Sequence, residues 1–316
     1  MNLRQLEYFV HVAELGSFSK AALVLDIAQP ALSRQVRALE TDLRETLLLR
    51  NGRGVQLTEA GQRLFEHSVG ILQMVSRARE DMGASRDEPV GRIVIGLPPS
   101  MGRQLTLPLI DAFRAQLPRA RLAIVEGLSA HITEWIVTGR VDLGLLHNPE
   151  AAPALEITPL LDEPLCLVQP APGGRARGRG RGRTARGPLP LRELPGFPLI
   201  VPDRSHAIRK LLETQAMLAG LELDIAWEVA SVPSIIDLVC AGYGYAVLSA
   251  GAVAASGRAA ELAVRPLVEP PLSSVLCLAS SAHKRPTPLV RHASRLLRER
   301  VAALPMPQLA MPVRHS

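Results

Sequence analysis

The second half of the chain repeats one succession of predicted elements, and this repeat restricts the fold more than any other feature. Residues 91–147 are predicted to form strand, helix, strand, helix and strand, and residues 197–249 follow the same order. An offset of 103 residues places Gly139 on Gly242, each after the second helix of its unit. Strands that alternate with helices form a parallel sheet covered by helices. The repeat therefore predicts two similar α/β lobes rather than one large sheet.

Two apolar segments flank the second unit and predict how the lobes are joined. The segment EPLCLVQP precedes this unit, and EPPLSSVLCLAS follows it. Both are suited to crossover strands, which would make the first lobe discontinuous. The predicted two-lobed domain spans residues 91–303, with lobe 1 formed by 91–163 and 269–303 and lobe 2 formed by 164–268.

The turns between the strands and helices predict a ligand cleft between the lobes. Parallel α/β lobes bind ligands where strand carboxyl ends meet helix N-termini, because free backbone N–H groups and the helix dipole attract anions. The predicted cleft residues are Ser100, Met101, Ser129, His147, Pro202, Ser205 and His206. Each alone also fits a helix cap or a surface position. Their convergence from both lobes favours a site for a small acidic or polar metabolite.

The N-terminal segment predicts three short helices, the third of which has two chemically different sides. Apolar residues recur at three- and four-residue steps up to Gly16, a second helix begins near Ser17, and a third begins near Ala28. On the third helix the apolar side consists of Leu32, Val36 and Leu39, and the opposite side carries Pro30, Ser33, Arg34 and Arg37. With Gln29, this polar side suits insertion into a DNA major groove. The alternative is an ordinary solvated helix face.

A hairpin signal follows the third helix. The stretch LLLRNGRGVQLT predicts two strands joined at Asn51 and Gly52, with Arg50 and Arg53 at the tip. Arginines on such a wing can reach the minor groove or the DNA backbone and add position rather than sequence information. The expected module is a winged helix-turn-helix over residues 1–58, with the helix-turn-helix at 18–37.

A single long helix is predicted after Thr58, which is suited to cap it. This linker helix spans residues 59–88 with a polar hinge at its end. Its apolar stripe, which predicts pairing with a second copy of the chain, consists of Phe65, Val69, Leu72 and Val75. Packing of the stripe against its own N-terminal module is the alternative.

These motifs resemble the LysR-type transcriptional regulators. The stretches LRQLEYFVHVAELGSFSKAA, AQPALSRQVRALE and RGVQLTEAG stand at that family's positions and spacing, with a weaker similarity to its nitrogen-assimilation control branch. Two positions depart from the family pattern: Arg44 replaces a glycine after the third helix, and Leu48 replaces a phenylalanine. Arginine in a left-handed conformation costs about 1 kcal/mol relative to glycine, so the approach to the wing is expected to differ slightly.

The resemblance implies a fold, a function and partners. The implied fold is α/β, with an N-terminal all-α winged helix-turn-helix, a long linker helix and a two-lobed effector domain like the type 2 periplasmic binding proteins. The cleft residues match the family's inducer site. The implied partners are double-stranded DNA, a small-molecule effector, further copies of the chain in a homodimer or homotetramer, and RNA polymerase. The competing interpretation is a two-lobed solute-binding or transport protein without a role on DNA.

The net charge of +6 is concentrated in one segment. Residues 173–187 contain six arginines and no acidic residue, which leaves the rest of the chain close to neutral. A solvated loop is the expected role of this segment, and auxiliary phosphate contact is the alternative. DNA affinity of the N-terminal module must therefore come from the placement of its arginines.

Other function classes find no support in the sequence. Eight histidines and three cysteines occur without metal-ligand spacing, and there is no nucleophile elbow or phosphate loop. We expect no enzyme activity, no metal and no cofactor other than the effector. No apolar run approaches a membrane span, and no signal peptide is recognised, so a cytoplasmic location is expected. The tail, 304–316, has no predicted role.

Overall fold

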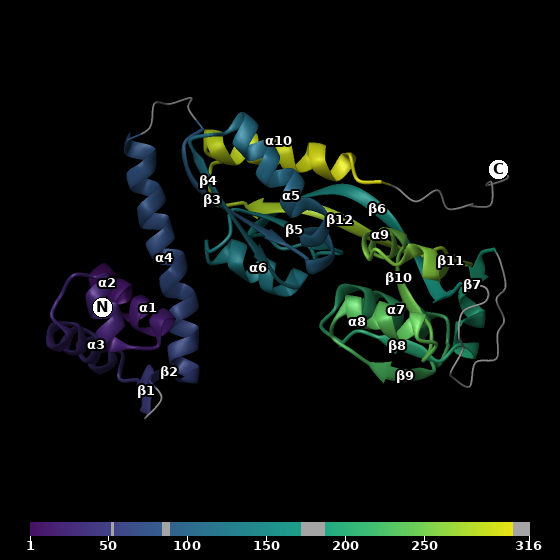
Figure 1. Ribbon diagram of the computed structural model, residues 1–316, viewed down its shortest axis with the longest axis horizontal. Coiled ribbons are helices and arrows are strands. Elements are labelled where there is room, and N and C mark those ends of the chain that lie inside the picture. Colours follow the sequence, from purple (N-terminus) through teal and green to yellow (C-terminus); the bar gives the residue numbers. More distant parts are fainter. Residues whose placement is uncertain (52–53, 84–88, 172–186, 306–316) are drawn as a thin grey trace.

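The computed structural model describes residues 1–51, 54–83, 89–171 and 187–305. Three parts follow one another: a small helical module, a long helix, and a larger two-lobed α/β unit (Figure 1). The arginine-rich segment except Gly187, most of the predicted hinge, Arg53 of the wing and most of the tail lie outside the described residues.

The N-terminal module has the three helices and the hairpin that the sequence predicts. Its elements are α1 (Leu3–Leu15), α2 (Phe18–Val24), α3 (Gln29–Leu43), β1 (Leu48–Asn51) and β2 (Gly54–Leu57). Asn2 and Gln5 cap α1 reciprocally, each side chain accepting from the other's backbone N–H at 2.9 and 3.0 Å. Gly16 ends that helix with φ of 60°, and the Ser17 side chain caps α2. The predicted helix boundaries are thus confirmed by local capping chemistry.

The buried side of α3 forms the centre of the module. Leu32, Val36 and Leu39 are 0–1% exposed and pack with the apolar sides of α1 and α2. The helix ends at Arg44, which adopts the left-handed conformation with φ of 56°. Glycine adopts this conformation most easily, and Arg44 stands at the position where the family pattern has glycine.

The wing differs from its prediction by one residue. Asn51 pairs with Gly54 across the two strands, so Asn51 belongs to β1 rather than to the turn. The reason is that Asn51 takes the last place in the β1 ladder. Leu48, the second departure from the family pattern, is buried in the module's core.

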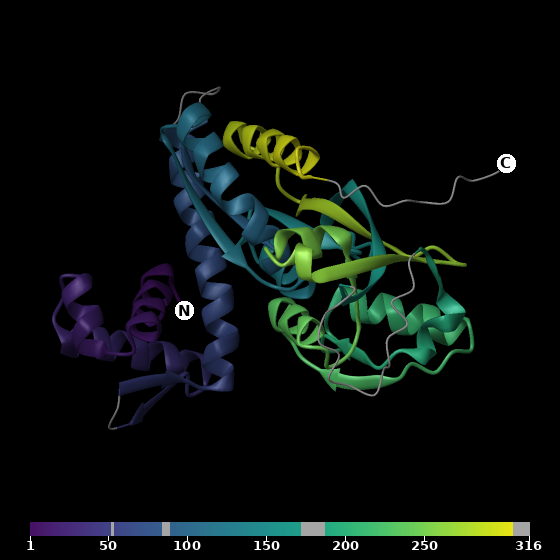
Figure 2. The same ribbon diagram turned by 45° about the vertical axis from the view of Figure 1, so that its right-hand side comes forward.

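The long helix α4 (Glu59–Gly83) connects the module to the two lobes, as Figures 1 and 2 show. The Thr58 hydroxyl accepts a hydrogen bond from the Gly61 N–H at 2.9 Å and caps its start. Phe65, Val69 and Leu72 pack against the core of their own module. These three side chains remain half-buried, as does Val75 outside that core, so pairing of the stripe with a second copy of the chain stays a prediction.

The two α/β units have the predicted order of elements. The first contains β3 (Gly91–Leu97), α5 (Pro99–Gln116), β4 (Ala120–Glu126), α6 (Ser129–Val137) and β5 (Leu143–His147). The second contains β8 (Leu199–Val201), α7 (Ala207–Leu218), β9 (Ile225–Glu228), α8 (Val232–Cys240) and β10 (Ala246–Ser249). Strand β3 pairs in parallel with β4 and β5, and β8 with β9. Gly139 and Gly242 both have φ of 79°, so the repeat extends to backbone conformation.

Long crossover strands run between the lobes and are hydrogen-bonded into one eight-stranded sheet, whereas β8 and β9 form a separate two-stranded sheet. The remaining elements are β6 (Leu155–Pro170), β7 (Leu189–Pro190), α9 (Ala250–Ala255), β11 (Leu262–Val268), β12 (Ser273–Ser281), α10 (Pro288–Ala302) and the 3₁₀ helices Leu191–Gly196 and Ala259–Glu261. The strand order is β4-β3-β5-β12-β6-β11-β7, and β10 also pairs with β6. The prediction of two lobes is confirmed, and β6 is long enough to run through both of them.

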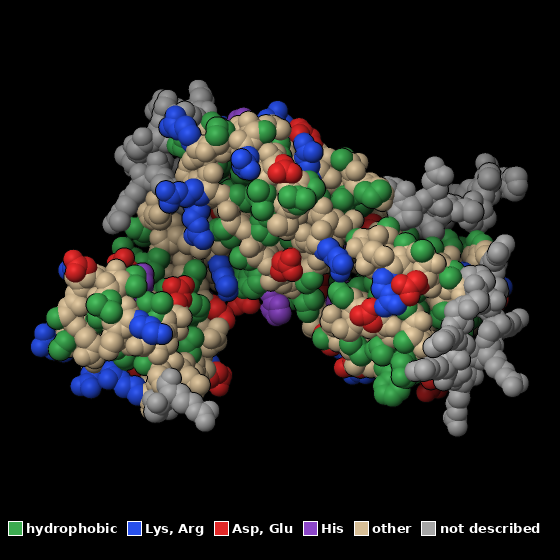
Figure 3. Space-filling view, in the orientation of Figure 1, with side chains coloured by type: hydrophobic (Ala, Val, Ile, Leu, Met, Phe, Trp, Pro, Cys, Tyr) green, Lys and Arg blue, Asp and Glu red, His purple; other side chains and the backbone are tan. Residues whose placement is uncertain are grey.

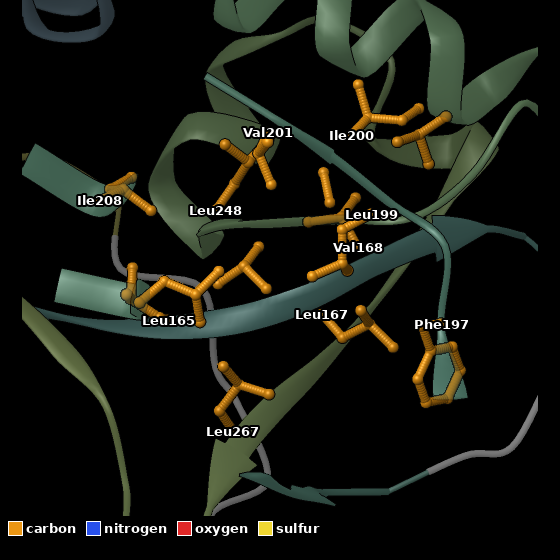
Figure 4. Close-up of a cluster of buried hydrophobic side chains, with 14 of the residues drawn as sticks. Leu165, Leu167, Val168, Phe197, Leu199, Ile200, Val201, Ile208, Leu248 and Leu267 are labelled. Carbon is orange, nitrogen blue, oxygen red and sulfur yellow. The ribbon is translucent and has the colours of Figure 1, made fainter. Parts of the chain in front are cut away.

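Each lobe nevertheless has its own apolar core. One core gathers around α5, α10 and the first half of β6, and the other around the second half of β6, α7, α8 and β10. Figure 4 shows the second core, with Val168 on β6 lying toward Leu199 and Leu167 on the opposite side of the strand, toward Phe197 and Leu267. The cores separate where β6 passes Glu163 and Pro164. The domain and lobe boundaries given above remain predictions.

None of the helices in the described residues combines the length and hydropathy needed to cross a membrane. The three cysteines are free, and burial raises the pKa of the Cys166 thiol to about 12.

Candidate nucleic-acid interface and ligand cavity

The polar side of α3 lies on the surface of the N-terminal module. Gln29, Pro30, Arg34 and Arg37 are exposed, and Ser33 is half-buried beside them. Figure 3 shows Lys and Arg side chains along the edge of the module where Figure 1 draws α3. Among the described residues neither arginine has an ion-pair partner, so both guanidiniums are available to an external anion.

The wing is fastened to both helices of the helix-turn-helix through one side chain. The Arg50 guanidinium donates to the Ser33 hydroxyl at 2.9 Å and lies over the Phe18 ring, 4.2 Å from its centroid. Sequence reasoning identified Arg50 and Ser33 separately but not their contact. Phe18 was missed because its role depends on the packing of α2 against β1.

A cavity of about 550 Å³ lies between the two lobes. Of the seven predicted cleft residues, Ser100, Ser129, His147 and His206 line it. They come from the start of α5, the start of α6, the end of β5 and the N-cap of α7. The structure therefore brings together side chains from the strand ends and helix N-termini of both lobes.

The other three predicted cleft residues lie elsewhere. Met101 is 1% exposed in the core of lobe 1, because successive helical residues point about 100° apart and Ser100 takes the cavity side. Ser205 is exposed, and its hydroxyl donates to the Asp203 carboxylate. Pro202 is buried, and its carbonyl accepts from Arg209 at 3.4 Å.

The cavity also has lining residues that the sequence reasoning did not identify. The polar ones are Arg103, Ser231, Asp237, Ser249, Ser256, Arg258 and Ser274. Ser231 sits at the start of α8, the position that the repeat equates with the start of α6, so an alignment of the two units could have found it. Ser274 comes from crossover strand β12, whose register depends on pairing with β5 and β6.

His147 and His206 are neutral at neutral pH. Burial, together with a smaller effect of the nearby His206, lowers the pKa of His147 to about 4. Burial also lowers the pKa of His206, against the opposing effect of the Asp203 carboxylate. The charges of Asp237 and Arg258 compensate each other, since the Arg258 guanidinium donates to Asp237 and to Glu261, the latter at 2.7 and 2.8 Å. Arg103 is the lining charge that this pairing does not balance.

Helix α6 connects the cavity with the long helix α4. At its start the Ser129 hydroxyl accepts from the His147 backbone N–H at 3.0 Å. At its end Gly70 of α4 approaches so closely that a Cβ there would lie 2.1 Å from the Thr138 carbonyl oxygen. The Gln73 amide, oriented to satisfy its neighbours, donates to the carbonyls of Gly139 and Arg140 at 3.1 and 2.9 Å. Helix α6 thus contacts both the cavity and the long helix α4.

Two family models match the chain. The model described as "Bacterial regulatory helix-turn-helix protein, lysR family" matches residues 3–62, and "LysR substrate binding domain" matches residues 86–302. The second match alone covers more than half of the chain.

Full-length relatives match over nearly the whole chain. The nitrogen assimilation regulatory protein nac of Klebsiella aerogenes is 30% identical over 300 residues, which cover 94% of each protein. The solved structure of a full-length OxyR variant from Pseudomonas aeruginosa has a TM-score of 0.69 at 23% identity, covering 99% of both chains. A structure of full-length CbnR complexed with its target DNA has a TM-score of 0.54 at 24% identity, covering 95% of this chain and 100% of that one.

These matches agree with the structure. An exposed basic helix and wing stand at one end, and a cavity between two lobes stands at the other. The family consists of transcriptional regulators and not of enzymes, and its members combine a helix-turn-helix DNA-binding domain with an effector-binding domain. The chain belongs to the LysR family of bacterial transcriptional regulators.

Proposed function

We propose that this regulator reads DNA with the exposed side of α3 and the wing, and that a small molecule in the inter-lobe cavity modulates this binding. The observation that carries the DNA contact is the arrangement of α3. Its apolar side is fully buried, so Arg34 and Arg37 project away from the protein. Arginine can grip guanine edges or phosphates in the major groove.

Arg50 and Ser33 support the same surface. The bond from Arg50 to Ser33 fixes the wing against the start of α3, and the Phe18 ring holds the guanidinium in place. A wing fastened in this way keeps a constant distance from the recognition helix, which is what contacts to a groove and its neighbouring backbone require.

The effector is proposed to act by linkage between the two sites. A ligand that prefers one arrangement of the lobes shifts the equilibrium of the whole molecule, and couplings of about 1–3 kcal/mol change DNA affinity about 5- to 150-fold. Helix α6 offers a direct path, because Ser129 lines the cavity and Thr138 contacts Gly70 of α4. Altered occupancy or bending of a promoter then changes the access of RNA polymerase.

A homo-oligomer is proposed as the working form. Apolar side chains remain exposed on both lobes: Leu107 on α5 is 69% exposed, Met217 on α7 is 73% exposed, and Trp227 on β9 is 53% exposed. Hydrophobic side chains gather over β9 in Figure 3. Burial against a second copy would remove these surfaces from water. Sedimentation of the full chain should give a mass above the 34.1 kDa monomer; a monomer at micromolar concentration would contradict this part.

The proposed DNA contact is tested by replacing single arginines of α3 with alanine. Arg34→Ala and Arg37→Ala should each weaken binding to the upstream region of the regulated gene by about 1–3 kcal/mol, measured by fluorescence anisotropy. Arg295→Ala removes an equally exposed arginine from α10 and should leave affinity unchanged. Equal weakening by all three variants would contradict the assignment of α3.

The cavity is tested with the complementary variants. Ser129→Ala should weaken the stabilisation of the protein by its effector while leaving DNA affinity unchanged, and Arg34→Ala should do the reverse. Thermal denaturation with a metabolite panel measures the first effect. Loss of both functions from each change would contradict the division of labour between the two regions.

A further inference from the structure

The cavity contains one histidine from each lobe, and the hydrogen bonds around the two rings define which nitrogen carries the proton. His147 ends β5 in lobe 1, and His206 is the N-cap of α7 in lobe 2. Both line the cavity. The inference below rests on the proposed role of this cavity and concerns the chemistry of its ligand.

The His206 ring is protonated on Nε2. Its Nδ1 accepts a hydrogen bond from the Ile208 backbone N–H at 3.3 Å. A backbone N–H can only donate, so Nδ1 holds a lone pair, and the proton of the neutral ring is on Nε2. The helix cap therefore fixes the tautomer.

The His147 ring reaches the same state through a chain of three hydrogen bonds. The Val275 backbone N–H donates to Asn148 Oδ1 at 2.8 Å, which orients the amide so that its Nδ2 donates to the Ser274 hydroxyl at 3.3 Å. The Ser274 oxygen lies 3.2 Å from His147 Nδ1 and its side chain is fully buried, so we assign the hydroxyl hydrogen to this nitrogen. The proton of the neutral His147 ring is consequently also on Nε2.

A hydroxyl donor joins the two imidazoles, while the carboxylate on the wall is engaged. The Ser129 oxygen accepts from the His147 backbone N–H, which leaves its own hydrogen free to donate. The Asp237 carboxylate accepts from Arg258. Burial keeps both rings uncharged, as their lowered pKa values indicate. The two rings and Ser129 thus offer neutral donors from both lobes, and Arg103 is a charged donor in the same lining.

We propose that His147 and His206 form a pair of Nε2–H donors across the cleft, and that the ligand is a small carboxylate. Its oxygens accept from both rings and from Ser129, and its apolar part packs against Ile208, Val232 and Ile236, which line lobe 2. A carboxylate only accepts hydrogen bonds, so it matches this set of donors. An amide or an ammonium group would place its own N–H groups against them, and a site with mismatched polar groups rejects such analogues strongly.

The experiment compares matched probes on the full-length protein. Acetate, 3-methylbutanoate and cyclohexanecarboxylate are each titrated against the corresponding primary amide and amine at pH 7, with thermal midpoint and calorimetric affinity as readouts. We expect the carboxylates with larger apolar groups to bind at least about 10-fold more tightly than their amides, and the amines to be rejected.

Two variants of His206 separate the donor from the helix cap. His206→Asn keeps an acceptor that can cap α7 but removes the donor at Nε2, whereas His206→Gln restores a donor near the Nε2 position. Carboxylate affinity should fall about 10-fold in the first variant and recover at least partly in the second, with similar thermal midpoints without ligand.

The remaining outcomes distinguish this inference from the assignment of the cavity. Amides that bind as tightly as carboxylates, and lose affinity in Ser129→Ala, would overturn the donor pair and leave the cavity as the effector site. Carboxylate binding that is equal in both His206 variants and in the wild type would also overturn the donor pair. Probes that never respond to a cavity variant would overturn both assignments.

Discussion

The two surfaces proposed to meet anions, the outer side of α3 and the cavity between the lobes, use opposite chemistry. On α3, Arg34 and Arg37 are exposed, fully charged and without ion-pair partners among the described residues. In the cavity, His147 and His206 are half-buried and neutral. Access to water therefore determines whether a protein can use charged or neutral hydrogen-bond donors. A charge on the surface keeps its hydration until the partner arrives, whereas a charge held in a closed cavity is costly throughout.

This contrast also separates strength from selectivity. Exposed guanidiniums attract any polyanion and lose affinity as salt rises, because binding releases condensed counterions. Neutral donors in a confined site attract weakly over distance but reject ligands with misplaced hydrogen atoms. The same chain can therefore search DNA by charge and select a small molecule by hydrogen bonding.

The largest predicted effect concerns the buried support of the α3 surface. Leu32 is 0% exposed at the centre of the module, so Leu32→Ala should reduce the free energy of unfolding of this module by about 2–5 kcal/mol. Urea denaturation followed by circular dichroism measures it. Arg34 lies on the exposed side of the same helix, so Arg34→Ala should change the free energy of unfolding by less than about 0.5 kcal/mol. Equal losses would mean that the charged side of α3 is part of the fold rather than free for DNA.

Salt dependence compares the two surfaces directly. DNA affinity should fall by a factor of about 10 or more between 50 and 200 mM salt, with a slope reduced by about 1 in Arg34→Ala. Affinity of the cavity for a small carboxylate should change far less over the same range, because its donors are neutral. Parallel titrations by anisotropy and calorimetry provide the comparison. Equal slopes would remove the chemical distinction between the two surfaces.

The sequence predicted the elements of both regions better than the contacts between them. Local patterns were sufficient for α3, since the spacing of Leu32, Val36 and Leu39 defines its buried side without knowledge of its neighbours. The repeat was similarly visible, and Gly139 and Gly242 share one backbone conformation.

Contacts that depend on long-range packing could not be predicted. Ser274 reaches the cavity only through the register of β12 with β5 and β6, and the orientation of Met101 depends on how α5 rolls onto its sheet. The stripe of Phe65, Val69 and Leu72 is compatible with two partners in sequence; the fold shows that it contacts its own module, and pairing with a second copy stays a prediction.

Glu163 provides a smaller test of how the cavity region tolerates charge. It lies on β6 where the lobes meet, is 4% exposed, and has one carboxylate oxygen without a partner among the described residues. Burial raises its pKa, although the Ser249 hydroxyl opposes this effect. A raised acid pKa means that the unfolded chain ionises first, so stability falls as pH rises from the unfolded pKa near 4.5 to the folded one.

Glu163→Gln should therefore stabilise the protein at pH 7 by about 1–3 kcal/mol, since the amide removes the buried charge and keeps a group for Ser249. Below pH 4 the carboxyl is protonated in both states, and the advantage should disappear. Denaturation at both pH values tests this sign. A stabilisation that persists at low pH would indicate a packing effect instead of a charge effect.

The smallest predicted effect distinguishes the placement of arginines from their total number. Arg44 is exposed directly after α3 in the left-handed conformation, with φ of 56°. Arg44→Gly should raise the free energy of unfolding by about 1 kcal/mol, because glycine adopts this conformation without strain.

The same change removes one positive charge close to the proposed DNA surface. If placement governs affinity, DNA binding should weaken much less than in Arg34→Ala, although both variants lose one charge from the same module. Arg44→Lys keeps the charge and the strain, so its stability and DNA affinity should both match the wild type. Weakening of Arg44→Gly to the level of Arg34→Ala would show that bulk charge, rather than the side of α3 turned away from the core, determines the attraction to DNA.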